Sequence, residues 1–344
     1  MDVWRAMQDH GMEELIFCQD QKSGLKAVIA LHSTKLGPAL GGCRLWSYAS
    51  EQEAIEDAMK LAKGMTYKAA ISGLPYGGGK AVVLKHVGMK RDAAFAALGR
   101  FIERLHGEYI TGVDLGTTPQ DMDQINRETR HVTDQSGTLG ATGNFTAEMT
   151  AYGVFLGIQT SLTCKYGLTD MKGVRIALQG LGKVGYALAR RLHQAGAQLI
   201  VSDIDPGKIS QAVQKFNALP VSSENIHLHS CEVYAPCAMG GTLTHLSIPQ
   251  LSCGIVAGAA NNQLADEQLC DMLEQRNILY APDYAINAGG ILSTGAELAG
   301  TGARGATAAV EKIPGTLKHL YEYARKNGIT TASAADTIAE AKFA

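Results

Sequence analysis

Residues 174–185 read VRIALQGLGKVG, a short apolar run that ends in closely spaced glycines. The apolar residues 174–179 predict a buried strand, the glycines a tight turn, and residues 183–194 a helix. A second strand-like run follows at 198–202, so strand, helix and strand fit within about 30 residues. Such a βαβ unit requires two parallel strands joined by a right-handed crossover.

Each glycine of this turn has its own expected role. Gly180 allows the tight turn, Gly182 lets the backbone approach a pyrophosphate, and Gly185 lets helix and strand pack closely. The start of the helix then offers free N–H groups to phosphate oxygens. Taken alone, such a run could also be a set of ordinary turn glycines. In its strand-turn-helix context it predicts a dinucleotide-binding loop formed by Gly180, Leu181, Gly182, Lys183, Val184 and Gly185.

An acidic residue ends the second strand of the unit. Asp203 follows Gly180 by 23 residues, close to the roughly 20 expected of a carboxylate that binds the ribose hydroxyls of NAD. A carboxylate here repels the 2′-phosphate of NADP, and no Lys or Arg lies between Asp203 and Lys208 to offset this repulsion. Asp203 could instead cap the helix that begins near Pro206, although Asp205 is better placed for that. NAD is therefore the expected cofactor.

The flanking segments define the fold class. Apolar runs at 233–235, 254–257 and 278–280 alternate with helical segments, as a doubly wound sheet requires. The first third of the chain also mixes elements: strands at 25–31, 81–84 and 109–113, a helix over 51–64 after Ser50, and a helix at Pro119 after Thr118.

Gly, Ser and Thr gather at 136–144, which is typical of a hinge between domains. We therefore expect an α/β protein of two domains with a cleft between them. Residues 1–135 would form an α/β substrate-binding and oligomerisation domain, and 136–324 a doubly wound Rossmann domain that binds NAD. Helices over about 325–344 would pack back on the first domain.

Composition excludes several classes of protein. Lys and Arg number 31 against 33 for Asp and Glu, so no charge excess would attract nucleic acid or a membrane surface. No apolar run approaches the roughly 18 residues of a membrane span, and residues 1–19 lack a secretory pattern. The seven cysteines and ten histidines are scattered, which indicates neither a disulfide framework nor a metal site. A cytoplasmic protein is expected.

Three charged residues of the first domain stand in unusual settings. Lys80 follows three glycines and leads into an apolar strand, so we expect it to be partly buried, where a lysine can act as a base near neutral pH. It does not belong to a Walker A loop, because Leu74 and Ala81 stand where that loop needs other residues. Lys68 follows the 51–64 helix, in a predicted loop. Asp114 ends an apolar strand, where either chemistry or turn capping is expected.

Several segments together resemble the amino-acid dehydrogenase superfamily of glutamate, leucine, phenylalanine, valine and tryptophan dehydrogenases, and most closely its leucine dehydrogenase branch. The resemblance runs over nearly the whole chain. It is carried by GPALGGCR at 37–44, LAKGMTYK at 61–68, GGGK at 77–80, DLGTT at 114–118, ANNQL at 260–264 and PDYAINAGG at 282–290.

The resemblance implies a role for each matching residue. Lys68 would bind the substrate carboxylate with the backbone around Gly41 and Gly42. Lys80 would activate water against the imine, and Asp114 would exchange protons with the amino nitrogen. The other substrate contacts implied are Leu40, Gly112, Asn262, Ile291 and Thr294. Thr150, Asn261 and Asn287 would face the nicotinamide end of the cofactor.

The reaction implied is the reversible, NAD-dependent oxidative deamination of an apolar L-amino acid, leucine or another branched-chain one, to the 2-oxo acid, ammonium and NADH. Glutamate-specific relatives place a lysine at the position of Leu40, where a buried glutamate side chain would leave its charge unpaired. Leucine-specific relatives usually have alanine and valine where this chain has Gly112 and Thr294, so a roomier and more polar pocket is expected.

Two alternatives stay open. The chain could be a phenylalanine or tryptophan dehydrogenase with the same mechanism. One methyl group in a pocket changes substrate preference too little to separate these from a leucine dehydrogenase. A non-catalytic NAD-binding regulatory protein would lack at least one of Lys68, Lys80 and Asp114, and all three are present.

Two features depart from the family pattern. Residues 139–150 replace a shorter Gly-Asn-Pro-Ser-Pro run, which bears on the hinge and on Thr150. The sequence ends at Ala344, before the tail that octameric leucine dehydrogenases use between subunits, so a homodimer is expected.

Overall fold

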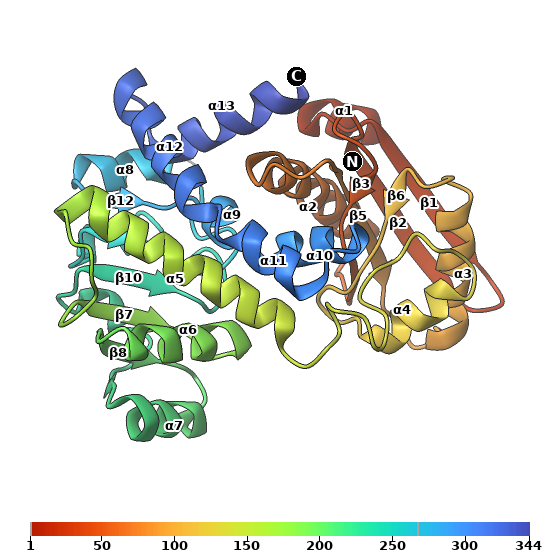
Figure 1. The fold of residues 1–344 in the computed structure, drawn as a ribbon. Helices are drawn as coiled ribbons and strands as arrows, with labels where there is room; N and C mark the ends of the chain where they lie inside the picture. The colour runs from red at the N-terminus through yellow and green to blue at the C-terminus, as the bar shows by residue number, and fades with distance from the viewer. Residues whose placement is uncertain (1, 267) are drawn as a thin grey trace. The chain divides into compact units, whose positions relative to one another are not determined.

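The computed structural model describes residues 2–266 and 268–344, which fold into two compact units (Figure 1). Unit 1 contains the chain up to Gly143 together with Thr294–Ala303 and Ala339–Ala344, and unit 2 contains Asn144–Ser293 and Arg304–Ile338. Residues 136–143 and 294–303 thus lie in unit 1, and of the residues after 324 only Ala339–Ala344 do. The predicted α/β class, with an N-terminal domain followed by a Rossmann domain, is confirmed.

Unit 1 is built on a mixed six-stranded sheet. Its strands are β1 Glu14–Asp20, β2 Leu25–Ser33, β3 Ala39–Leu40, β4 Cys43–Trp46, β5 Gly77–Leu84 and β6 Tyr109–Ile110. β1, β2 and β5 are antiparallel neighbours, whereas β3 and β4 both pair in parallel with β5, and β6 pairs in parallel with β3. Because β2 and β5 are buried along almost their whole length, the sheet is covered on both faces.

Helices cover both faces of this sheet. They are α1 Val3–His10, α2 Glu51–Ile71, α3 Arg91–Glu103 and α4 Pro119–Asn126. Apolar residues of α2 pack with Val28, Ala30 and Val82 in one core, while α3 and α4 enclose a second core with the opposite residues of the strands. The catalytic candidates of unit 1 are therefore fixed by a rigid, two-sided core.

The first turn of α2 agrees with the sequence, but its end does not. Ser50 Oγ accepts the N–H of Glu53 at 3.2 Å, as the capping pattern predicts. The helix then continues past Gly64 to Ile71, so the prediction that Lys68 lies in a loop is wrong. Gly64 carries no side chain to clash and has open space around it, and the Lys342 ammonium donates to the Ala70 carbonyl at 2.7 Å, which satisfies an otherwise unpaired group at the helix end.

Unit 2 is a doubly wound parallel sheet of order β12–β11–β10–β7–β8–β9. Its strands are β7 Arg175–Gln179, β8 Gln198–Ser202, β9 Leu219–Pro220, β10 Val233–Pro236, β11 Ile255–Val256 and β12 Leu279–Tyr280. The order changes direction between β7 and β10, which is where such sheets bind ligands.

The helices that alternate with these strands are α5 Phe145–Tyr166, α6 Lys183–Gln194, α7 Pro206–Phe216 and α8 Leu269–Gln275. After β12 come α9 Asp283–Ile286, α10 Gly289–Leu298, α11 Gly302–Val310, α12 Ile313–Asn327 and α13 Thr331–Phe343, of which the parts within Thr294–Ala303 and Ala339–Ala344 belong to unit 1. Short 3-10 helices occur at Ile226–Leu228 and Ile248–Gln250. Figure 1 shows α5 running beside α6 and α12. None of the described helices is long and apolar enough to cross a membrane.

Candidate active site

The three glycines before Lys80 form the first half of β5, and each is required by close packing. A Cβ on Gly77 would lie 1.8 Å from the Ser33 carbonyl oxygen, and one on Gly78 would lie 2.1 Å from the backbone nitrogen of Thr66 in α2. A Cβ on Gly79 would meet the buried ring of Tyr109 at 2.9 Å. The glycines therefore let α2 and β6 approach the strand, and this approach encloses Lys80.

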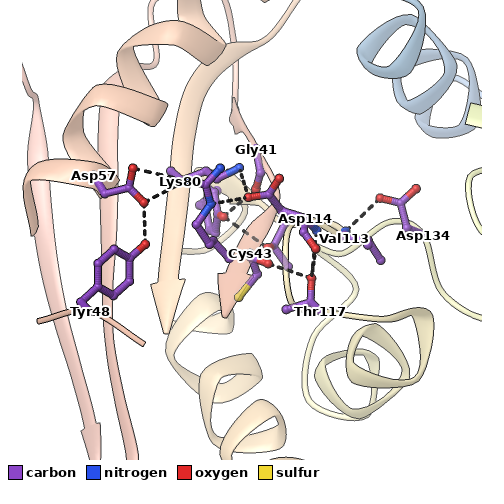
Figure 2. Close-up of polar contacts among 12 residues, drawn as sticks. Gly41, Cys43, Tyr48, Asp57, Lys80, Val113, Asp114, Thr117 and Asp134 are labelled. Atoms are coloured by element: carbon purple, nitrogen blue, oxygen red, sulfur yellow. Dashed lines mark hydrogen bonds and ion pairs between the residues drawn. The ribbon is translucent and has the colours of Figure 1, made fainter. Parts of the chain in front are cut away.

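Lys80 is buried and forms an ion pair with Asp114. Its side chain is 6% exposed, and its Nζ lies 2.9 Å from Asp114 Oδ2 (Figure 2). Asp114 follows β6, and the hydroxyl of Thr117 accepts its N–H at 2.9 Å and donates to the Cys43 carbonyl at 2.8 Å. The two predicted catalytic residues are thus in direct contact, and Asp114 retains 26% of its side-chain exposure.

A second cation holds Asp114, and the sequence interpretation gave it no role. Arg44, in β4, donates from Nε to Asp114 Oδ2 at 3.0 Å and from Nη1 to Asp57 of α2 at 3.0 and 3.3 Å. Burial raises the pKa of Asp114, but Lys80 and Arg44 lower it by more, so its pKa lies below the ordinary value of an aspartate. The signal available in the sequence was the arginine that closes the 37–44 motif.

Gly41 and Gly42 separate β3 from β4 at the floor of this cluster. A Cβ on Gly41 would lie 1.8 Å from the Gly79 carbonyl oxygen, and one on Gly42 would lie 2.6 Å from the Val113 carbonyl oxygen. The N–H of Gly41 donates to Ile110 at 3.1 Å, whereas that of Gly42 has no partner in the described part of the chain. Gly42 is therefore the one of the two whose N–H is available to a ligand.

Lys68 and Leu40 lie around the same glycines. Lys68 is half-buried in the last turn of α2, one turn after Met65, whose side chain lies 3.3 Å from the Cβ position of Gly41. Residues three apart share a helix face, so Lys68 is on the face turned toward the Gly41 loop. Leu40 is buried in β3, between β5 and β6.

Gly112 faces polar groups of its own unit. A Cβ there would lie 2.5 Å from Asp134 Oδ2 and 2.6 Å from Thr133 Oγ1, so the extra room expected at this position is already filled. Asp134 Oδ2 accepts the N–H of Val113 at 3.0 Å, and the N–H of Asp134 donates to Glu297 at 3.2 Å. Burial, together with the charge of Glu297, raises the pKa of Asp134. Thr294 precedes Glu297 by one turn of α10.

The glycine turn of unit 2 has the predicted strand-turn-helix structure. Gly180 has φ +97°, which favours glycine, and a Cβ on Gly185 would lie 2.0 Å from the Gly180 carbonyl oxygen. A Cβ on Gly182 would meet nothing within 4 Å. Gly182 starts α6 without a side-chain cap, and Lys183 and Val184 are its first helical residues. The open space and uncapped N–H groups suit a phosphate group.

Asp203 is attached to this turn. Its Oδ2 accepts the N–H of Leu181 at 2.6 Å, and its Oδ1 accepts the N–H of Asp205 at 2.9 Å. Burial raises the pKa of Asp203, but these N–H groups and the nearby ammonium of Lys208 lower it by more, so the carboxyl has a pKa below its ordinary value. Asp205, not Asp203, caps α7 through the N–H of Gly207 at 2.8 Å.

The remaining predicted residues of unit 2 follow β11 and β12 or begin α5. Asn287 Nδ2 donates to Asn261 Oδ1 at 2.7 Å and to Ala259 at 3.1 Å, while its own buried Oδ1 has no partner in the described structure. Thr150 Oγ1 lies 3.6 Å from the Cβ position of Gly290, three residues after Asn287. Asn262 is exposed beside Asn261, and Ile291 is buried in α10.

Comparison with known proteins identifies the family. Residues 13–131 match the model of the Glu/Leu/Phe/Val dehydrogenase dimerisation domain, and residues 140–209 and 203–343 match that of the Glutamate/Leucine/Phenylalanine/Valine dehydrogenases. The chain belongs to the Glu/Leu/Phe/Val dehydrogenase family. It is accordingly an amino-acid dehydrogenase that uses a nicotinamide cofactor and small-molecule substrates.

Individual members of the Glu/Leu/Phe/Val dehydrogenase family resemble the chain over its whole length. It is 45% identical over 344 residues to the leucine dehydrogenase of Bacillus subtilis and 46% identical over 344 residues to that of Thermoactinomyces intermedius, in each case covering 100% of this chain and 94% of the relative. The crystal structure of L-tryptophan dehydrogenase from Nostoc punctiforme matches with a TM-score of 0.88 and 40% identity, covering 99% of this chain and 98% of that one. The predicted leucine dehydrogenase branch is confirmed.

The residues of unit 2 fit the nicotinamide cofactor of this dehydrogenase family. The cradle at Gly182 has room that a Cβ would reduce, and the helix start beside it is uncapped. The orphaned carbonyl oxygen of Asn287 is buried and would accept a carboxamide N–H. By contrast, no group of three or more His, Cys, Asp or Glu in residues 2–266 and 268–344 is placed to hold a metal ion.

Proposed function

We propose that the chain catalyses the reversible oxidative deamination of L-leucine and other branched-chain L-amino acids with NAD, giving the 2-oxo acid, ammonium and NADH. The observation that carries this proposal is the ion pair between the buried Lys80 and the partly exposed Asp114 beside the Gly41–Gly42 loop. The high identity to leucine dehydrogenases over the whole chain supports the substrate.

The substrate carboxylate would bind between Lys68 and the free N–H of Gly42. Lys68 carries the positive charge and lies on the α2 face turned toward this loop. The Gly42 N–H is the backbone donor at this position that the sheet does not use. An ammonium and one N–H hold a carboxylate in a fixed orientation, which places its α-carbon for reaction.

Asp114 and Lys80 would handle the protons. Asp114 Oδ1 has no hydrogen-bond partner in the described part of the protein, so it is free to take a proton from the α-amino group. Once Lys80 has released its ammonium proton to solvent, its neutral amine would take, after hydride loss, a proton from the water that attacks the imine carbon. Asp114 would then return a proton to the nitrogen as it leaves, and the contact of 2.9 Å lets protons pass within the pair.

The cofactor, when bound, accepts the hydride from the α-carbon. We propose NAD rather than NADP, because the carboxylate of Asp203 is ionised beside the glycine turn and repels a 2′-phosphate. Gly180, Gly182 and Gly185 would cradle the pyrophosphate against α6, and Asn287, Asn261 and Thr150 would hold the nicotinamide end.

The substrate side chain would be recognised by Leu40, Gly112 and Thr294 of unit 1, and Asn262 and Ile291 are the substrate-binding residues proposed in unit 2. Leu40 is apolar and buried, so it disfavours the second carboxylate of glutamate. The space next to Gly112 is occupied by Asp134 and Thr133, which favours an aliphatic side chain over a larger aromatic one.

The chain would act as a homodimer. The support is the match of residues 13–131 to a dimerisation domain. Sedimentation velocity measures this directly: a single species of about twice the mass of 36.5 kDa is expected, and an octamer would contradict the assignment.

The proposed function is tested by NADH formation at 340 nm with L-leucine, L-valine, L-isoleucine, L-phenylalanine, L-tryptophan and L-glutamate, each with NAD and with NADP. Activity with NAD on the aliphatic substrates is expected. A preference for aromatic substrates would move the chain to the tryptophan or phenylalanine branch with the same mechanism. No activity on any substrate, with NAD binding intact, would support a regulatory protein.

A further inference from the structure

Arg44 joins two carboxylates that come from distant parts of the sequence. Its Nε donates to Asp114 Oδ2 at 3.0 Å, and its Nη1 contacts both oxygens of Asp57, at 3.0 and 3.3 Å. The side chain is 21% exposed, so its three contacts are partly shielded from water. The family resemblance assigns neither Arg44 nor Asp57 a role in the reaction.

Arg44 and Lys80 bind the same oxygen of Asp114. Lys80 Nζ lies 2.9 Å and Arg44 Nε 3.0 Å from Oδ2. The other oxygen, Oδ1, has no partner among the described residues. Oδ1 is therefore the oxygen that a substrate amino group could reach. A carboxylate held by two cations on one oxygen cannot rotate without breaking both ion pairs, so Oδ1 is fixed in place.

Asp57 in turn fixes Arg44. It projects from α2 and accepts a hydrogen bond from the hydroxyl of Tyr48 in addition to the guanidinium (Figure 2). The planar guanidinium can contact two carboxylates at once in a fixed geometry, which the single ammonium of a lysine does not reproduce. The chain of contacts runs from Tyr48 through Asp57 and Arg44 to Asp114.

We propose that Arg44, held by Asp57, is a positioning residue for Asp114. It directs Oδ2 toward Lys80, presents Oδ1 for proton exchange with the substrate nitrogen, and keeps the carboxylate charged. This inference rests on the proposed function, because it assumes that Asp114 exchanges that proton. The lowered pKa of Asp114 agrees with it.

The groups around Asp114 decide the expected pH behaviour. The charges that act on it are those of Lys80 from β5 and Arg44 from β4, and Asp57 of α2 acts through Arg44. The thiol of Cys43 and the hydroxyls of Tyr109 and Tyr48 also face this set, but their pKa values are raised, so they stay uncharged. Loss of a cation from this set favours the protonated form of the groups beside it. Removing Arg44 should therefore move the acid limb of the kcat profile to higher pH.

The test compares Arg44→Met, Arg44→Lys and Asp57→Asn by steady-state kinetics with L-leucine and NAD between pH 6 and 11. Arg44→Met should lower kcat about 10²-fold. It should leave the KM for L-leucine and the Kd for NAD within about threefold of the wild-type values. It should also move the acid limb of the kcat profile to higher pH. Arg44→Lys should return the acid limb to its wild-type pH but restore only part of kcat. The lysine returns the positive charge but cannot contact Asp57 and Asp114 at once in the geometry of a guanidinium. Asp57→Asn should lower kcat without raising the acid limb.

Arg100→Met is the matched control, because it removes an arginine from an exposed ion pair with Glu128 in the same unit. It should leave kcat and the pH profile unchanged. The inference would be overturned if Arg44→Met kept the wild-type kcat and the wild-type acid limb. It would also be overturned if Arg44→Lys restored kcat fully, or if Arg44→Met lost stability alone. If Arg44→Met does not fold, Arg44→Lys and Asp57→Asn decide by the same criteria. An inactive wild-type enzyme would instead refute the proposed function.

Discussion

The two glycine runs of this protein look alike in sequence and differ in structure. In unit 1, Gly77 and Gly78 would each place a Cβ within 2.1 Å of backbone atoms from a neighbouring element. In unit 2, Gly182 would place its Cβ in open space, although Gly185 of the same run is as tightly packed as the first pair. One run lets α2 approach the sheet that carries Lys80, and the other leaves room for a ligand.

The difference shows what a glycine motif can and cannot predict. A glycine is required where a Cβ would collide with the protein, and it is required where a Cβ would collide with a ligand. The sequence of 77–80 was interpreted as a sign of function, yet its glycines have a sufficient packing reason. Of the two runs, only Gly180–Gly185 contains a position, Gly182, where an added Cβ would meet nothing within 4 Å.

The largest expected effect is the loss of stability caused by Gly78→Ala. Gly78→Ala would bring a Cβ to 2.1 Å from the Thr66 backbone nitrogen, and backbone cannot move aside as a side chain can. We expect a loss of about 3 kcal/mol in the free energy of unfolding, measured by urea denaturation. The matched control is Gly64→Ala in α2, the helix that contains Thr66, where nothing lies within 4 Å of the new Cβ and a gain of up to about 1 kcal/mol is expected. Equal stability of the two variants would contradict the packing account.

Acid should loosen the same packed region. His32, 7% exposed, lies with Nδ1 2.8 Å from Thr66 Oγ1, and burial, with a smaller effect of Lys63, lowers its pKa from 6.5 to about 4. Because the folded pKa is below the unfolded one, the unfolded chain binds more protons between these values. His32 therefore costs no stability above pH 6.5 and about 2 kcal/mol at pH 5.

The measurement is urea unfolding of wild type and His32→Asn at pH 7.5 and pH 5. The wild type should lose about 2 kcal/mol more than the variant over this interval. The same loss in both proteins would show that His32 is not the group that makes the region sensitive to acid.

The Gly182 position should respond in binding and not in stability. Gly182→Ala should leave the urea midpoint unchanged and raise the Kd for NAD about tenfold, because the methyl group occupies the approach to the pyrophosphate. Intrinsic fluorescence or calorimetry measures the Kd. An unchanged Kd would remove the distinction between the two runs.

The smallest expected effect concerns Gly112 and Asp134. Gly112→Ala would bring its Cβ to 2.5 Å from Asp134 Oδ2, whereas Asp134→Gly removes that carboxyl at a residue with φ +61°, which glycine tolerates. The double variant should therefore show an interaction energy of about 1 kcal/mol relative to the single variants. Additive effects on unfolding would indicate that the contact does not shape this part of the pocket.

Local patterns predicted most of the fold. The helix at Lys183–Gln194 and the strand at Gln198–Ser202 have the predicted bounds, because periodicity and turn glycines are properties of adjacent residues. The end of α2 was missed because it depends on packing against β5 and on Lys342, which lie elsewhere in the sequence.

The site was predicted in part for the same reason. Lys80 and Asp114 were identified and lie in contact, but Arg44 was not, since its role depends on the meeting of β4, α2 and the segment after β6. Asp134 was missed as well, because a carboxylate beside Gly112 is visible only once 110–115 and 133–134 are packed together.

The central claim is that Lys80 and Asp114 carry out the proton chemistry of amino-acid oxidation. It is tested most directly by NADH formation from L-leucine in Lys80→Ala, with NAD binding measured on the same protein and Lys85→Ala, an exposed lysine just beyond the same strand, as control. The account predicts a loss of about 10³-fold in kcat for Lys80→Ala with unchanged NAD affinity, and full activity for the control. A Lys80→Ala enzyme that turns over L-leucine at the wild-type rate would contradict it.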